Sequence, residues 1–237
     1  MRKRVKPSGD APIAIMVAMD SEMKSLLSMM DNASGDFPYV EGVMADRPVV
    51  VAQAGVGKVH AAITALTLVR QFKPSCLIGA GVAGAVSKAV GIGHVVISNR
   101  TVQHDFDCTA HNLPRGHIYG LKERFFVSDP KLVELAERSA LAVLPKDAVH
   151  VGTIATGDQF VTDSEVRAGI EREFDALALE MEGGAIGQVA LLCTVPYVII
   201  RSISDKADGQ AGETYLLNLE DASQRMAAIV RGIVAAY

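Results

Sequence analysis

The chain has 237 residues, of which 49% are hydrophobic and 21% are charged, so it can bury a large core within one domain. Its net charge is −4 and its isoelectric point is near 5.9, which argues against a nucleic-acid-binding surface. The sequence contains no run of about 18 apolar residues, so it predicts no membrane span.

The first residues, MRKRVKPSGD, are basic, and residues 11–19 are apolar, an order that also occurs in signal peptides. The apolar run is short and no small-residue cleavage site follows it. We therefore predict a flexible basic tail over residues 1–11 and a buried first strand. The three cysteines, Cys76, Cys108 and Cys193, are widely spaced and odd in number, which predicts reduced thiols in a cytoplasmic protein.

Short apolar strands alternate with helical patterns along the rest of the chain. Strands are predicted at residues 13–19, 76–80, 94–98, 150–156, 175–181 and 196–204, with a hairpin at 38–54, and helices at 21–31, 58–72, 129–143, 163–172, 183–193 and 217–236. Near-continuous Val, Ile and Leu strands separated by helices are typical of a largely parallel sheet covered on both faces. The sequence predicts an α/β fold in a single domain over residues 12–237.

Polar residues and glycines follow several of these strands, where ligands bind in such sheets. They are Asp20, Ser21 and Glu22, residues 79–84, His104 and Asp105, residues 157–160, residues 180–182 and residues 201–205. An unpaired carboxylate buried within a strand would cost several kcal/mol, so Glu180 and Glu182 are expected at a strand end beside polar groups. One crossover helix joins the strands that end at Glu182 and Asp205, which predicts that these strands are neighbours.

Three motifs suggest cofactors but fit poorly. Residues 79–84, GAGVAG, match the dinucleotide fingerprint, yet the connection to the next strand is about nine residues and holds no long helix, so we predict a tight turn. A phosphate loop would need glycine in place of Ala52 and Ser or Thr in place of Val59. The spacing within residues 104–111, HDFDCTAH, fits no zinc pattern. We predict neither a cofactor nor a metal.

Six motifs together carry a family resemblance. They are AMDSEM (18–23), AGVGKVHAA (54–62), GAGVAGAV (79–86), TGDQFV (156–161), LEMEGGAI (179–186) and RSISDKAD (201–208). From about residue 13 onward the chain resembles the 5′-methylthioadenosine/S-adenosylhomocysteine nucleosidases of the nucleoside phosphorylase/hydrolase superfamily. The resemblance implies a nucleoside phosphorylase-like catalytic domain that hydrolyses the N-glycosidic bond of a 5′-thioadenosine and releases adenine. It also implies a homodimer, because in this family a partner loop completes the site.

The resemblance also implies roles for individual residues. Glu22 matches the general base that activates water, and Asp205 matches the acid that protonates the departing adenine. Glu182 matches the residue that holds the ribose hydroxyls and faces the cationic sugar of the transition state. The other implied contacts are Ser204 positioning Asp205, Phe160 stacking on the base, the Val161 backbone at its edge, Met181, Val82 and Ala83 beside the sugar, and Arg201 orienting Glu182. Glu180 receives no role.

Two departures from the family pattern leave alternatives open. Val82 stands where the family commonly has serine, and the loop around His111 lacks the usual aromatic residue, so a futalosine-type substrate is possible. A phosphorylase is the nearest enzymatic alternative, but such enzymes place an arginine after the first strand to hold phosphate, whereas this chain has Glu22. A non-catalytic nucleoside-binding relative would be expected to lose Glu22 or Asp205, and both are present.

Overall fold

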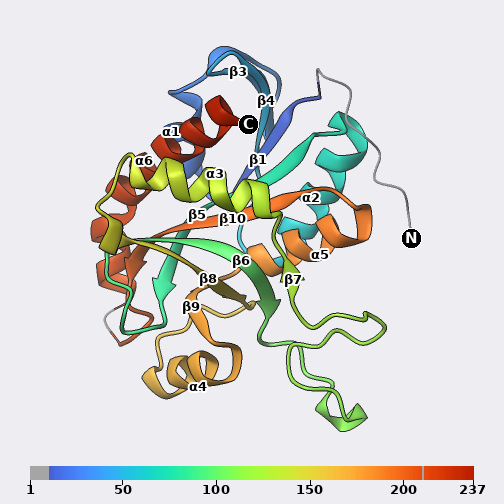
Figure 1. Cartoon of the computed structure of the whole chain (residues 1–237), viewed down its shortest axis with the longest axis vertical. Coiled ribbons are helices and arrows are strands. Elements are labelled where there is room, and N and C mark those ends of the chain that lie inside the picture. Colours follow the sequence, from blue (N-terminus) through green and yellow to red (C-terminus); the bar gives the residue numbers. More distant parts are fainter. Residues whose placement is uncertain (1–10, 210) are drawn as a thin grey trace.

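A ten-stranded sheet with helices on both faces organises the computed structural model, which describes residues 11–209 and 211–237 (Figure 1). The strands are β1 (Ile13–Val17), β2 (Asp31–Ser34), β3 (Tyr39–Met44), β4 (Arg47–Gln53), β5 (Cys76–Ala85), β6 (Val95–Gln103), β7 (Phe126–Val127), β8 (Val149–Thr156), β9 (Ala176–Glu180) and β10 (Tyr197–Asp205). The helices are α1 (Asp20–Leu27), α2 (Lys58–Phe72), α3 (Pro130–Leu141), α4 (Ser164–Phe174), α5 (Gly183–Cys193) and α6 (Ala211–Ala236), with short 3₁₀ turns η1 (Thr109–His111) and η2 (Lys146–Ala148). Except for Ala11, the predicted basic tail lies outside the described residues.

The sheet is mixed. Strand β1 lies between β4 and β5 and is parallel to both, and β4, β3 and β2 continue as an antiparallel meander that includes the predicted hairpin. On the other side, β5, β10, β6, β8 and β9 close into a ring, because each of these strands pairs with two of the others. The predicted α/β fold is confirmed. No helix among the described residues is long and apolar enough to cross a membrane.

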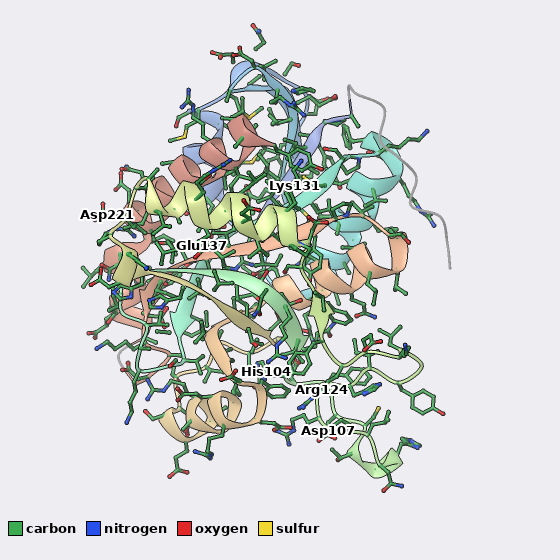
Figure 2. The ribbon with its side chains drawn as sticks, viewed as in Figure 1. His104, Asp107, Arg124, Lys131, Glu137 and Asp221 are labelled. Carbon is green, nitrogen blue, oxygen red and sulfur yellow. The ribbon has the colours of Figure 1, made fainter. Side chains whose placement is uncertain are left out.

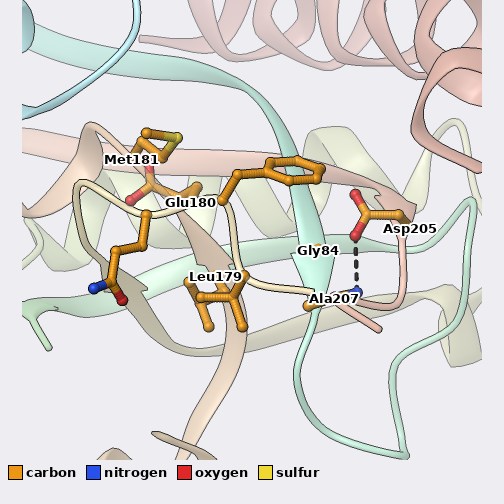
Figure 3. A pocket seen from close by; sticks show the side chains of 9 residues that line it. Gly84, Leu179, Glu180, Met181, Asp205 and Ala207 are labelled. Atoms are coloured by element: carbon orange, nitrogen blue, oxygen red, sulfur yellow. Dashed lines mark hydrogen bonds between the residues drawn. The ribbon is translucent and has the colours of Figure 1, made fainter. Parts of the chain in front are cut away.

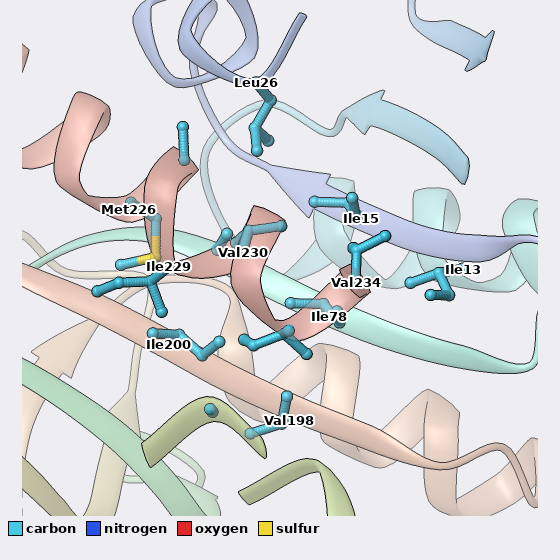
Figure 4. Packing of buried hydrophobic residues seen from close by; sticks show 14 of the residues in the cluster. Ile13, Ile15, Leu26, Ile78, Val198, Ile200, Met226, Ile229, Val230 and Val234 are labelled. Atoms are coloured by element: carbon cyan, nitrogen blue, oxygen red, sulfur yellow. The ribbon is translucent and has the colours of Figure 1, made fainter. Parts of the chain in front are cut away.

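Alternating side chains of the central strands feed two cores. In β1, Ile13 and Ile15 face the core beneath α6, whereas Ala14 and Met16 face the core beneath α2 and α5. Figure 4 shows the first of these cores, in which Met226, Ile229, Val230 and Val234 of α6 pack over Ile15, Ile78, Val198 and Ile200. Burial on both faces explains why these strands read as continuous apolar runs.

The glycine-rich stretch at residues 79–84 forms no turn, so that prediction is wrong. Strand β5 continues to Ala85 and is hydrogen-bonded to β10 over most of its length. The glycines provide space instead: a Cβ at Gly79 would overlap Ile199, and a Cβ at Gly84 would lie 2.8 Å from Oδ1 of Asp205. Larger residues in β5 would therefore displace side chains of β10.

Three other predictions about elements need correction. Strands β9 and β10 are not neighbours, because β5 lies between them and pairs with both. Strand β6 runs through Arg100 to Gln103, where the sequence predicts a loop after residue 98, and Arg100 bonds to Thr153 of β8. Helix α6 begins at Ala211 rather than near 217, and α1 ends at Leu27 rather than at residue 31, so that Asp31 begins β2 instead of ending a helix.

Candidate active site

A pocket with an empty volume of about 270 Å³ opens at the ends of β5, β8, β9 and β10 (Figure 3). It is lined by Gly84, Gln159, Phe160, Val161, Leu179, Glu180, Met181, Asp205 and Ala207. A smaller hollow of about 180 Å³ is lined by Glu182 and Arg201 together with residues of β1, β5 and α5 and with Ala54, which follows β4. The predicted site residues thus gather at one edge of the sheet.

Glu22 is buried at the start of α1, with 4% of its surface exposed. Its Oε2 accepts hydrogen bonds from the amides of Ala18 (2.9 Å) and Met19 (3.0 Å), and its Oε1 accepts one from the amide of Val82 (3.1 Å). Burial raises the pKa of Glu22, against the opposing effects of Arg201 and these three amides. The carboxyl group is held rigidly and takes up a proton more readily than an exposed glutamate.

Glu180, which sequence reasoning left without a role, is the main partner of Arg201. Both side chains are buried, and Glu180 Oε2 accepts hydrogen bonds from Nε (3.1 Å) and Nη2 of Arg201. The same oxygen accepts from the amides of Glu182 (3.1 Å) and Gly183 (2.7 Å), while Oε1 accepts from the hydroxyl of Thr156. Glu180 therefore neutralises the buried arginine and fixes the start of α5.

Glu182 contacts Arg201 less closely, with 3.5 Å between Oε2 and Nη2, so the predicted pairing is secondary to that with Glu180. Its Oε1 accepts a 2.9 Å hydrogen bond from the amide of Gly57, in the loop between β4 and α2. Burial and the nearby Glu180 raise the pKa of Glu182 to about 7, although Arg201 and the Gly57 amide lower it. Small changes around this carboxyl group would change its charge near neutral pH.

Asp205 ends β10 and lines the larger pocket. Its Oδ2 accepts a 2.9 Å hydrogen bond from the Ser204 hydroxyl, and its Oδ1 accepts one of 2.8 Å from the amide of Ala207. Burial raises the pKa of Asp205 despite these two donors. A raised pKa favours the protonated form, which can donate to a ligand in the pocket.

Strand β5 separates Glu22 from Asp205. The amide of Val82 bonds to Glu22, and Gly84 lies directly against Asp205. Two residues of a strand span roughly 7 Å. Ala83, between them, is buried and pairs with Ile203 of β10. The two carboxyl groups therefore lie on opposite sides of β5, against positions two residues apart along the strand.

Phe160, Val161 and Met181 form the apolar wall of the pocket. Phe160 is 53% exposed and makes an edge-to-face contact with Tyr215, with 6.1 Å between ring centroids. The Tyr215 hydroxyl donates to the sulfur of Met19 at 2.9 Å. Sequence reasoning missed Tyr215 because it placed the start of α6 after this residue.

Among the described residues, no group of three or more His, Cys, Asp or Glu side chains could hold a metal ion. The segment HDFDCTAH is divided instead: His104 is buried against Gly157, whereas Asp107 lies on the projecting segment between β6 and β7 (Figures 1 and 2). His111 ends the η1 turn of that segment. The site instead combines the carboxyl groups of Glu22 and Asp205 with an apolar wall.

The model of the phosphorylase superfamily matches residues 12–235. A relative from Bacillus pumilus named 5′-methylthioadenosine/S-adenosylhomocysteine nucleosidase is 37% identical over 218 residues, which are 89% of this chain and 93% of the relative. The chain belongs to this nucleosidase family within the phosphorylase superfamily. The resemblance carried by the six motifs is thereby confirmed.

Solved structures agree with this family assignment. The nucleosidase of Neisseria meningitidis, in complex with methylthio-immucillin-A, superposes with a TM-score of 0.91 at 36% identity and covers 96% of this chain and 100% of its own. A futalosine hydrolase of Helicobacter pylori superposes with a TM-score of 0.89 at 30% identity and covers 96% and 99%. Members of the family thus differ in the substrates for which they are named.

Proposed function

We propose that this protein hydrolyses the N-glycosidic bond of 5′-methylthioadenosine, S-adenosylhomocysteine or both, releasing adenine and a 5-thioribose. The observation that carries the proposal is the pair of buried carboxyl groups, Glu22 and Asp205, on either side of β5 in a chain of the nucleosidase family. Two carboxyl groups with raised pKa values on opposite sides of one strand end suit acid–base chemistry at a glycosidic bond.

In this mechanism Glu22 is the general base. The oxygen of a water molecule bonds to the anomeric carbon as the bond to adenine breaks, and Glu22 takes the proton that the water loses. Positive charge grows on the sugar in the transition state, and a fixed anion facing it lowers the barrier. Glu182 supplies that anion and holds the ribose hydroxyls, with Gly57 and Arg201 keeping its carboxylate in place.

Asp205 is the acid. The electrons of the broken bond move onto adenine, and Asp205 donates a proton to the five-membered ring of the base. The raised pKa and the bond from Ser204 support this assignment. Phe160 stacks on the base, and the backbone of Val161 bonds its edge; both residues line the same pocket as Asp205.

The sugar is bound next to β5. Met181, which lines the pocket, packs against the ribose, with Val82 and Ala83 on the opposite side. Because the amide of Val82 already donates to Glu22 and its side chain has no donor, Val82 gives the sugar an apolar contact. Recognition of the ribose hydroxyls thus depends on Glu182.

Helices α2 and α5 support the proposal that the protein is a homodimer. The two helices pack together and expose Val59 (69%), Ile63 (59%), Leu66 (36%), Leu191 (46%) and Leu192 (53%). Several large exposed apolar side chains on two helices that pack together are typical of association sites on soluble proteins. The face adjoins Gly57, which bonds to Glu182, so a second copy docked there would lie beside the site. Light scattering should give the mass of two chains; the mass of one would contradict this assignment.

Residues 12–237 are proposed to form one catalytic domain, in agreement with the span of the family model over 12–235. The proposed location is the cytoplasm. All three cysteines are free thiols, Cys76 being buried, which suits a reducing compartment.

The identity of the 5′-substituent is decided by a substrate comparison. Purified protein is incubated separately with 5′-methylthioadenosine, S-adenosylhomocysteine, adenosine and a 6-amino futalosine analogue, and release of adenine is followed for each. We expect the first two to be cleaved fastest. Preference for the futalosine analogue, the substrate class of a related solved structure, would reassign the protein within the family. No adenine from any of the four would refute the proposed function.

A further inference from the structure

Three loops at the edge of the site are tied together by Lys58, Asp105 and Asp158. The Lys58 ammonium donates to Oδ1 of Asp105 at 2.6 Å, and the Asp158 amide donates to Oδ2 of the same carboxylate at 2.9 Å. The Lys58 amide in turn donates to Oδ1 of Asp158 at 2.8 Å. The contacts form a closed circuit, with Asp105 bonded to both other members.

Each of the two loops held by Asp105 carries part of the proposed site. Gly57, directly before Lys58, donates the amide bond to Glu182. Phe160 and Val161, which line the pocket, follow Asp158 by two and three residues. Asp105 itself follows the end of β6, so it connects these two loops to a strand of the ring.

Burial makes these contacts stronger than those of a surface ion pair. The side chains of Lys58 and Asp105 are each 18% exposed. Burial alone would raise the pKa of Asp105, but the bonds from Lys58 and from the Asp158 amide outweigh it and lower the pKa. Asp105 therefore remains an anion at neutral pH.

His104, the residue before Asp105, also contacts the loop that begins at Gly157. His104 is buried, its amide donates to the carbonyl of Thr156 at 2.9 Å, and its ring lies against Gly157. Any Cβ at position 157 would overlap the imidazole. The loop that begins at Gly157 is thus packed on His104 and bonded to Asp105. These two contacts fix its position over the pocket.

We propose that Asp105 is a positioning residue: by bonding to Lys58 and to the Asp158 amide, it holds the Gly57 loop on Glu182 and the Phe160–Val161 loop against the pocket. Its effect on the reaction rests on the proposed function, whereas its effect on the two loops does not. Without the Asp105 charge, the Gly57 loop loses the contact through the Lys58 ammonium and keeps the Lys58 amide bond to Asp158, so Gly57 is held less firmly on Glu182, whose other charged neighbours are Glu180, Arg201 and Glu22.

The test compares Asp105→Asn with Glu173→Gln. The second variant removes one charge from a half-buried ion pair, Arg124 with Glu173 at 3.2 Å, in which Arg124 also contacts Arg115, Phe125 and Phe174. For Asp105→Asn we expect kcat/KM for adenine release to fall by between about tenfold and a hundredfold, the loss typical of a misplaced catalytic geometry. The acid limb of its pH profile should also move upward, because the Gly57 amide no longer favours the Glu182 anion. Glu173→Gln should change neither quantity.

Hydrogen exchange of the free protein tests the loops without relying on activity. Amides at residues 55–58 and 157–161 should exchange faster in Asp105→Asn and at the wild-type rate in Glu173→Gln. If Asp105→Asn folds poorly, Lys58→Met should reproduce the effects and Lys58→Arg should restore most of the activity. Unchanged exchange in both loops, or a lower thermal stability with an unmoved acid limb, would overturn the proposal. Inactivity of the wild-type protein alone would refute only the proposed function.

Discussion

Replacing Gly81 by alanine tests the packing between Glu22 and Arg201. A Cβ at position 81 would lie 2.6 Å from Nη1 of Arg201 and 2.9 Å from Oε1 of Glu22. Ordinary carbon contacts begin near 3.4 Å, so both groups are too close to the new Cβ, by roughly 0.5–1 Å. Arg201 is held by Glu180, and Glu22 by three amides, so neither can move without losing hydrogen bonds. A displacement of about 1 Å in such a site costs on the order of a hundredfold in rate.

The assay is kcat/KM for adenine release from 5′-methylthioadenosine, with thermal unfolding measured in parallel. Gly169→Ala is the matched control, because among the described residues nothing lies within 4 Å of a Cβ built there. Gly169 is inside α4, so alanine should raise the free energy of unfolding by about 0.5–1 kcal/mol and leave activity unchanged. Activity of Gly81→Ala within threefold of wild type would show that this close packing does not matter for catalysis.

Three further predictions concern the carboxyl groups. Glu22→Gln should lower kcat by about 10²–10⁴-fold because an amide cannot accept the proton of water; a loss of only a few-fold would remove Glu22 from the mechanism. Asp205→Asn should abolish the alkaline limb of the wild-type pH profile, since activity is lost as pH rises through the raised pKa of the acid; identical profiles would point to another donor. Glu180→Gln removes the closer of the two ion pairs that Arg201 makes among the described residues and leaves the 3.5 Å pair with Glu182; urea unfolding should show a loss of about 3 kcal/mol, whereas a loss below about 1 kcal/mol would contradict the role given to Glu180.

Much of the fold could be predicted because local patterns determine it. The strand over residues 13–17 and the helix over 58–72 appear close to where apolar periodicity places them. The order of strands was harder, because β5 pairs with β1, β9 and β10, which are distant in sequence. The glycines of β5 were interpreted as a turn because the sequence alone does not distinguish a glycine that makes room for a neighbouring side chain from one that bends the chain.

In the site, too, some features could be predicted from the sequence and others depend on the fold. Strand ends identified the region of Glu22, Glu182 and Asp205, because a parallel arrangement brings such ends to one edge. The partner of Arg201 could not be predicted, since Glu180 and Glu182 are two residues apart and only the fold decides which of them meets the guanidinium. The contacts of Asp105 with Lys58 and Asp158 span 47 and 53 positions in sequence, and no local pattern indicates them.

The central claim, hydrolysis, is tested most directly by the dependence of the reaction on phosphate. Glu22 occupies the attacking side of the proposed site and would repel a phosphate anion, and Arg201 is already engaged by Glu180. Adenine release from 5′-methylthioadenosine is measured without phosphate and in excess phosphate, and the sugar product is identified by mass. We predict equal rates and free 5-methylthioribose. A rate that rises and saturates with phosphate, together with 5-methylthioribose 1-phosphate as the product, would contradict the account.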